Sequence, residues 1–168
     1  QLTSLGDLVW HDLNGNGQQD GVEPGIPGLQ VQLFRSNGDF VNSTFTNASG
    51  KYLFEYLLPG TYKVLFKAPS GFEHTLANIG NDNTDSDMQN IPGVGLVATA
   101  TLVPGESNLT IDAGFYRCVP IGKLVWYDIN KNDVWNTNEN GINGLKVNLW
   151  RNQSGVWSIH DFKYTGQK

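Results

Sequence analysis

The chain has 168 residues, 39% of them hydrophobic and 11% aromatic, which is enough to bury a sizeable core. Its formal net charge of −5 excludes nucleic-acid binding through a basic patch, and no apolar run is long enough to span a membrane. Cys118 is the only cysteine, which excludes a disulfide within the chain, so the core or a bound ligand must hold the fold together.

A first strand is expected through Val9 and Trp10, and a calcium-binding pattern of twelve residues, 12–23, follows it. The candidate ligands stand at positions one, three, five, seven, nine and twelve of that pattern: Asp12, Asn14, Asn16, Gln18 (through its backbone carbonyl), Asp20 and Glu23. Carboxylate, amide and carbonyl oxygens are the ligands that Ca²⁺ prefers, and the lack of His and Cys argues against zinc. The alternative is an Asx-rich surface turn that binds nothing.

The residues after the loop predict a β scaffold. Two prolines, Pro24 and Pro27, forbid the helix that would follow a helical calcium hand. Residues 29–35 then alternate apolar and polar side chains, with Leu29, Val31 and Leu33 on one face. Further strands are expected over residues 41–47, 52–57, 61–67, 96–103 and 108–116, with Gly- and Pro-containing turns between them. Short strands at this spacing are typical of a β-sandwich, and we find no amphipathic helix.

A second acidic cluster lies at Asp82, Asp85 and Asp87, between two of the expected strands. Like charges so close together repel one another and favour either a bound cation or full solvation. A solvated loop with Asx turns is the alternative interpretation.

The chain then repeats itself. Gly-Asp-Leu-Val-Trp from Gly6 recurs as Gly-Lys-Leu-Val-Trp from Gly122, and Trp10 and Trp126 are 116 residues apart. Since an internal period indicates tandem units, we expect a complete first repeat over residues 1–117, a junction over 118–120 and the first part of a second repeat over 121–168.

The second repeat carries the calcium pattern again. Its candidate ligands are Asp128, Asn130, Asn132, Val134 (through its carbonyl), Asn136 and Glu139. Asp133 replaces the glycine of the sharp turn, and Asn136 replaces the carboxylate of Asp20. Because Asp tolerates the left-handed backbone better than most residues, the loop can still close. With one charge lost, we expect weaker calcium binding here than in the first repeat.

The order and spacing of several motifs resemble those of the B-repeat domains of serine-aspartate repeat surface proteins, the SdrD B-like domains, within the Cna-B-type β-sandwich group. The motifs that carry the resemblance are residues 5–10, 12–23, 24–31, 47–52, 58–62, 68–72 and 109–116. The resemblance implies an all-β, Cna-B/prealbumin-like antiparallel β-sandwich with its calcium loop after the first strand. It also implies that the loop around Asp82, Asp85 and Asp87 folds over one end of the sandwich and binds further calcium. Asp7 and Asp112, on the first and last strands, would be neighbours there and complete the ligands.

The resemblance further implies a non-enzymatic, calcium-stabilised structural module of an extracellular surface or secreted protein, a stalk or fibre. Its partners would be neighbouring repeats or, in a fibre, neighbouring subunits. The start at Gln1 reads as a mature product without a signal peptide. The Lys–Asn isopeptide bond of many relatives is not expected, because Phe66 and Asp7 stand where its Glu and Lys would be.

The alternative function is an adhesive module that recognises a host protein or a glycan. No catalytic motif supports an enzyme. Four Asn-x-Ser/Thr sequons begin at Asn42, Asn47, Asn108 and Asn152. Because about two would arise by chance in so polar a sequence, they do not decide whether the chain is glycosylated. Because the second repeat lacks counterparts of residues 52–116, either a longer protein or a neighbouring chain is expected to supply the missing strands.

Overall fold

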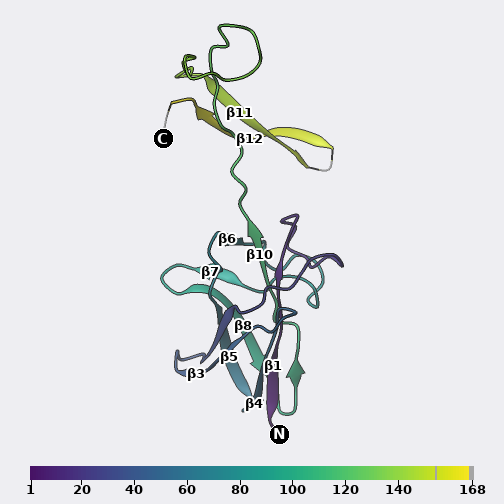
Figure 1. Ribbon diagram of the computed structural model, residues 1–168. Helices are drawn as coiled ribbons and strands as arrows, with labels where there is room; N and C mark the ends of the chain where they lie inside the picture. The colour runs from purple at the N-terminus through teal and green to yellow at the C-terminus, as the bar shows by residue number, and fades with distance from the viewer. Residues whose placement is uncertain (154, 167–168) are drawn as a thin grey trace. The chain divides into compact units, whose positions relative to one another are not determined.

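The computed structural model describes residues 1–153 and 155–166, which form two compact units, Gln1–Val119 (unit 1) and Pro120–Lys168 (unit 2). All the regular elements in the described ranges are β-strands (Figure 1), so the predicted all-β class is confirmed. No helix in those ranges could cross a membrane. The sequon at Asn152 includes residue 154, which lies outside the described residues.

Unit 1 consists of two sheets that face each other. The first has the strand order β4-β1-β10-β6, with β9 pairing beside β10 on β1, and the second has the order β3-β2-β5-β8-β7. Their bounds are β1 Thr3–His11, β2 Gln30–Arg35, β3 Phe40–Phe45, β4 Lys51–Leu57, β5 Gly60–Phe66, β6 Phe72–His74, β7 Gln89–Ile91, β8 Gly95–Leu102, β9 Ser107–Asn108 and β10 Ala113–Arg117. The pairings are antiparallel except those of β1 with β9 and with β10, which are parallel.

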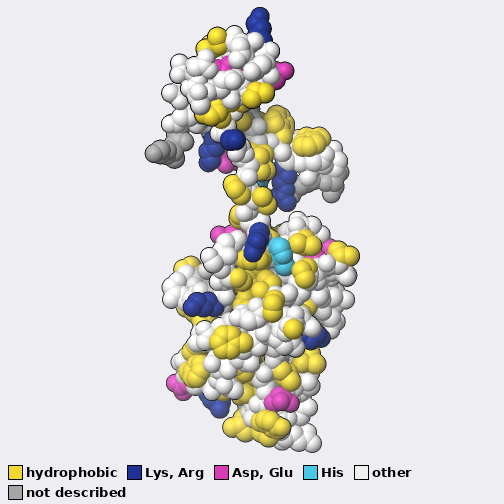
Figure 2. Space-filling model, viewed as in Figure 1, with side chains coloured by type: hydrophobic (Ala, Val, Ile, Leu, Met, Phe, Trp, Pro, Cys, Tyr) yellow, Lys and Arg dark blue, Asp and Glu magenta, His cyan; other side chains and the backbone are white. Residues whose placement is uncertain are grey.

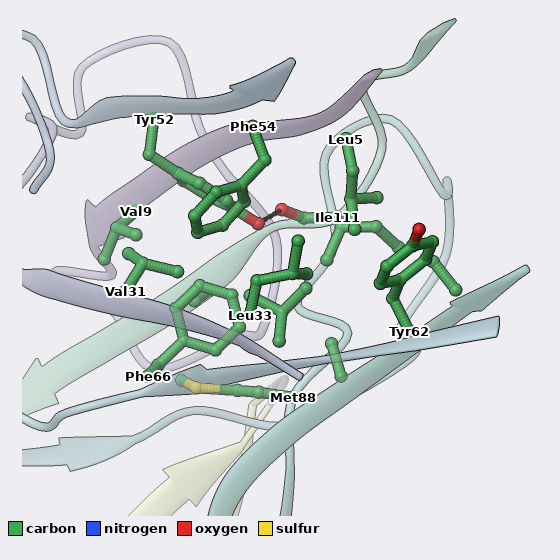
Figure 3. Packing of buried hydrophobic residues seen from close by; sticks show 14 of the residues in the cluster. Leu5, Val9, Val31, Leu33, Tyr52, Phe54, Tyr62, Phe66, Met88 and Ile111 are labelled. Carbon is green, nitrogen blue, oxygen red and sulfur yellow. Dashed lines mark hydrogen bonds between the residues drawn. The ribbon is translucent and has the colours of Figure 1, made fainter. Parts of the chain in front are cut away.

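The core of unit 1 lies between the sheets, because the strands alternate buried apolar and outward side chains. Val31 and Leu33 of β2 pack with Tyr52 of β4 and Phe66 of β5 (Figure 3). The Tyr52 ring meets the ring of Phe66 edge-on at a centroid distance of 5.7 Å. Its hydroxyl donates to the carbonyl of Ile111 over 2.7 Å, so the polar end of this buried ring is satisfied.

The prediction of one continuous strand over residues 108–116 is wrong for the middle of that range. The structure divides it into β9 and β10, and residues 109–112 belong to neither. Asn108 Oδ1 accepts a hydrogen bond from Thr110 N over 3.1 Å, an Asx turn that bends the chain. Two short strands that flank the acidic cluster, β6 and β7, were not predicted, because three-residue strands carry too little alternation to be recognised.

Unit 2 contains one antiparallel hairpin, β11 (Lys146–Gln153) and β12 (Val156–Tyr164). They correspond to β2 and β3, and the register shift after Leu149 recurs where β2 has one after Leu33. The expected counterpart of the first strand is not formed: of β1, only the isolated bridge between Trp126 and Gly141 recurs. The strands that hold β1 in unit 1, β4, β9 and β10, have no equivalents among the described residues of unit 2, so this segment has no sheet to join.

Candidate metal centre

The loop over residues 12–23 is closed around the side chain of Asp12, which directly follows β1 and is fully buried. Asp12 Oδ1 accepts a hydrogen bond from Gly15 N over 2.6 Å, and Oδ2 accepts one from Gly17 N over 2.9 Å. The backbone N–H of Asp12 donates to the carbonyl of Phe115 in β10 over 2.8 Å. The loop is therefore fastened to both the first and the last strand of the sheet.

The other predicted ligands gather in the same loop. The side chain of Glu23 folds back into the loop. Its Oε1 accepts a hydrogen bond from Leu13 N over 2.7 Å, and its Oε2 accepts one from Asp20 N over 3.0 Å. The amides of Asn14 and Asn16 both lie within hydrogen-bond distance of Asp20 Oδ2, at 2.7 and 3.1 Å. Five oxygen-bearing side chains thus belong to one small loop.

Gln18 differs from these five. Its side-chain amide donates to the carbonyl of Ile79 over 2.6 Å, outside the loop, so its side chain is committed elsewhere. The sequence pattern assigns this position a backbone carbonyl as ligand, and the orientation of the side chain is compatible with that assignment.

The donor set fits a hard divalent cation. Asp12 and Glu23 are 0% and 7% exposed, and the ion pairs found in the described ranges, Lys51 with Asp7 and Lys163 with Asp161, involve neither of them. Buried carboxylates without a cationic partner are costly, and an ion bound by oxygen ligands would compensate both. On the face shown in Figure 2, acidic and basic side chains are scattered rather than gathered into one patch.

The second loop reproduces the first at the same spacing. Asp128 Oδ2 accepts from Asp133 N over 2.9 Å, as Asp12 does from Gly17 N, and Glu139 accepts from Ile129 N and Asn136 N over 3.1 and 2.9 Å. Asn130 and Asn132 accept from the backbone two residues further on, as Asn14 and Asn16 do. Asp128, Asn130, Asn132 and Glu139 are thus arranged like their equivalents in the first loop. Asn136 differs from Asp20, because its amide donates to the carbonyl of Val134 over 2.6 Å.

The second loop closes with a strained backbone. Asp133 has a φ of 59°, where Gly17 has 84°, and Lys131 has a φ of 60°, where Gly15 has 71°. Sequence reasoning identified the exchange at Asp133 and missed the one at Lys131. A side chain in the left-handed region costs about 1 kcal/mol or more, so this loop is less favourable than the first.

The acidic cluster is a compact group in unit 1. Carboxylate oxygens of Asp82, Asp85 and Asp87 lie within 4.8 Å of one another, and Asp85 Oδ1 is buried with no hydrogen-bond partner. Met88, which follows them, is fully buried and anchors the segment in the core. A buried carboxylate oxygen without a partner, beside two further carboxylates, is a donor set that fits a hard cation.

Asp112 adjoins this group and Asp7 does not belong to it. Asp112 N donates to Asp87 Oδ2 over 2.7 Å, and Asp112 Oδ1 accepts from Leu8 N over 2.9 Å. Asp7 is partly exposed and pairs with Lys51 Nζ at 3.3 Å. Its negative charge still acts on Asp112 through space.

Burial alters the acidity of the cluster. Loss of hydration raises the pKa of Asp87 to about 7 and that of Asp112 to about 8, and the neighbouring carboxylates add to both shifts. Burial, with the charge of Asp82, also raises the pKa of Asp85. Without a cation, Asp87 and Asp112 would hold protons close to neutral pH.

The two candidate sites contact each other through the segment 75–88. Thr75 Oγ1 donates to Asp12 Oδ2, and Gln19 N donates to the carbonyl of Thr84 over 2.7 Å. Gln18 also forms a β-bridge with Asp85. Thr75 was not identified in the sequence, because a threonine 63 residues from its partner gives no local signal.

Comparison with known proteins gives consistent matches. The sequence model of a family described as the SdrD B-like domain matches residues 3–115. The chain is 43% identical over 151 residues to serine-aspartate repeat-containing protein F of Staphylococcus epidermidis, covering 88% of this chain and 9% of that protein. It is 43% identical over 155 residues to serine-aspartate repeat-containing protein C of Staphylococcus aureus, covering 90% and 15%. The chain therefore spans only a small part of these relatives.

Among solved structures, the minor pilin GBS52 of Streptococcus agalactiae matches with a TM-score of 0.44 and 16% identity, covering 73% of this chain and 46% of that one. A mutant of the shaft pilin SpaA of Lactobacillus rhamnosus GG matches with a TM-score of 0.43 and 10% identity, covering 71% and 51%. Likeness at this level is too weak to bear on function.

Proposed function

Because the chain belongs to the SdrD B-like domain family, we propose that it is a calcium-stabilised structural repeat of an extracellular surface protein, a module of a stalk or fibre without catalytic function. The observation that carries the calcium part is the pair of buried carboxylates of Asp12 and Glu23, which share one loop with three further oxygen-bearing side chains. The stalk part is supported by the internal repeat and by relatives named for their repeats.

Calcium would act on three segments at once. Loop 12–23 is bonded to β10 through Asp12 N, and to segment 75–88 through Asp12 Oδ2 and Gln18. An ion held in the loop would neutralise the buried charge of Asp12 and fix these contacts together. Since only the folded loop presents the ligands, binding would stabilise the protein by about 3 kcal/mol at a hundredfold excess over the dissociation constant.

The direct test is a pair of thermal melts of the whole chain, with calcium and with a chelator. We expect unit 1 to melt at a clearly higher temperature with calcium. A Glu23→Gln variant should lose most of the difference, whereas Glu55→Gln, an exposed position on β4, should retain it. Identical melting curves for the unaltered chain in both buffers would refute calcium stabilisation.

The stalk is tested separately by small-angle scattering. A protein with two complete repeats should be extended with calcium, because the loop and the strand ends beside the junction are then ordered together. Its maximum dimension should become broadly distributed with chelator. An unchanged distribution would argue against a calcium-stiffened stalk while leaving calcium binding itself intact.

A further inference from the structure

The two candidate calcium loops keep the same asparagines and differ in the residue that follows each of them. In loop 12–23 that residue is glycine at both places, whereas in loop 128–139 it is a residue with a side chain. The pairs are Asn14-Gly15 and Asn16-Gly17 in the first loop, and Asn130-Lys131 and Asn132-Asp133 in the second. The repeat therefore presents two forms of one loop within one chain.

A glycine after an asparagine permits a reaction between the backbone and the side chain. The glycine nitrogen attacks Cγ of the asparagine amide and forms an N–Cγ bond, and the side-chain nitrogen leaves as ammonia with the proton of the glycine nitrogen. Water then opens the cyclic imide to aspartate or isoaspartate, so one water is consumed for each ammonia released. Asparagine is thermolabile in proteins, and glycine has no Cβ to crowd the attack.

In the closed first loop, one carboxylate holds both glycine nitrogens. Gly15 N donates to Asp12 Oδ1 over 2.6 Å, and Gly17 N donates to Asp12 Oδ2 over 2.9 Å. The attack requires the glycine nitrogen to give up its proton, and losing a proton beside a carboxylate would place two negative charges together. The side chains of Asn14 and Asn16 are exposed, so water reaches them. The closed loop therefore restrains the reaction, and local opening of the loop releases it.

Packing explains why the first loop keeps a glycine at position 17. A Cβ at Gly17 would lie 2.7 Å from the carbonyl oxygen of Leu76, in segment 75–88. Asp133, its equivalent in unit 2, is exposed and is accommodated at a φ of 59°. A Cβ at Gly15, by contrast, would meet nothing within 4 Å. The first loop thus has an unstrained turn with reactive pairs, and the second has a strained turn without them.

We propose that Asn14 and Asn16 are sites of spontaneous deamidation that the closed loop protects, and that Lys131 and Asp133 remove these sites from the second loop. Water is the only co-reactant. The difference between the loops comes from the residue after each asparagine and does not depend on calcium. Only the calcium comparison in the test below rests on the proposed function.

The reaction would weaken the loop in which it occurs. The amides of Asn14 and Asn16 lie 2.7 and 3.1 Å from Asp20 Oδ2, to which they donate. In the aspartate product a carboxylate oxygen replaces that donor, and it repels Asp20 in an empty loop. In the isoaspartate product an extra backbone carbon displaces the oxygen that accepts from the backbone, as Asn16 Oδ1 does from Gln18 N over 2.8 Å. One conversion therefore favours opening of the loop and the next conversion.

The test incubates the whole chain in chelator at mildly alkaline pH and follows each asparagine by peptide mass spectrometry. Asn14 and Asn16 should convert at least about tenfold faster than Asn130 and Asn132, a difference of about 1.4 kcal/mol in activation free energy. Equal rates at these four positions would overturn the proposal.

A parallel incubation with calcium separates the sites from the proposed function. Calcium should slow the conversion of Asn14 and Asn16. It should not change the rate at Asn37, because Gly38 N is held by the carbonyl of Arg35 in the β2–β3 turn, over 2.9 Å. Faster conversion in the first loop than in the second, at rates that calcium does not alter, would support the sites and contradict calcium stabilisation.

Three variants exchange the reactive pair between the loops. Asp133→Gly should speed the conversion of Asn132 by about tenfold or more, whereas Asp133→Ala, which removes the charge and keeps a Cβ, should not. Gly15→Lys copies the residue of the second loop into open space and should protect Asn14 while Asn16 stays reactive. An Asn132 that stays unreacted in Asp133→Gly would overturn the proposal, because the second loop would then resist for a reason other than the residue that follows its asparagine.

Discussion

The hydroxyl of Thr75 donates to Asp12 Oδ2 over 2.5 Å, and both groups are buried. The bond joins two loops that are 63 residues apart in the sequence. Since Asp12 opens the candidate calcium loop and Thr75 opens the segment with the acidic cluster, the bond makes the geometry of one depend on the other.

The first prediction therefore concerns Thr75. Thr75→Val keeps the shape of the side chain and removes the donor, so unit 1 should lose about 1.5–3 kcal/mol of stability, the range for a hydrogen bond to a charged group. Calcium titration by calorimetry should show weaker binding at the Asp12 loop. Thr101→Val, which removes an exposed hydroxyl on β8, is the control and should change neither quantity appreciably. Equal calcium affinity in the two variants would contradict the role assigned to Thr75.

The second prediction concerns pH. Because burial raises the pKa of Asp87 to about 7 and that of Asp112 to about 8 from an ordinary value of 3.8, the folded calcium-free protein holds protons that the unfolded chain releases. The contribution of these two groups to the free energy of unfolding is at its maximum below about pH 4 and is lost as the pH rises toward about 8. Melts in chelator should thus give a higher melting temperature at pH 5 than at pH 8.

Asp112→Asn should flatten this pH dependence, since its neutral amide keeps the size of the side chain and cannot ionise. Asp39→Asn, at a surface turn before β3, is the matched control and should leave the slope unchanged. A slope that survives in Asp112→Asn would assign the pH dependence to other groups.

The third prediction exchanges the turn residues of the two loops. Asp133→Gly should stabilise the second loop by about 1 kcal/mol, because it removes the left-handed strain at φ 59°. Gly17→Asp should be much more damaging, since a Cβ at Gly17 would lie 2.7 Å from the carbonyl oxygen of Leu76, in addition to the strain at φ 84°. Calcium titrations of both variants measure the resulting changes in calcium affinity. Equal effects of opposite sign would mean that backbone strain alone decides loop closure.

Much of the fold and the loop could be predicted because the signals are local. The alternation of Leu29, Val31 and Leu33 and the offset between Trp10 and Trp126 are visible in the sequence. Thr75 could not be found, because its partner is set by how the long segment after β6 folds back on the sheet. The first strand of unit 2 was predicted wrongly because local sequence favours a strand there, whereas a strand forms only beside partners, and the equivalents of β4, β9 and β10 are missing from the described part of the second repeat.

The last prediction concerns Asp7, whose counterpart in the second repeat is Lys123. Asp7 pairs at the surface with Lys51, and its charge raises the pKa of Asp112 further. Asp7→Lys gives up a surface ion pair worth at most about 1 kcal/mol and sets a positive charge beside the buried carboxylates. A lysine there would perform part of the neutralisation that we assign to calcium at the acidic cluster.

We therefore expect Asp7→Lys to raise the melting temperature in chelator at pH 8 and to reduce the further increase that calcium produces. Asp7→Asn, which removes the negative charge without adding a positive one, should give an intermediate result. Glu106→Lys makes the same charge change beside β9, where Glu106 contacts Val103 N rather than the cluster, and should not raise the melting temperature in chelator. If the calcium-induced increase is the same in the Asp7→Lys variant as in the unaltered chain, Asp7 takes no part in the electrostatics of the cluster.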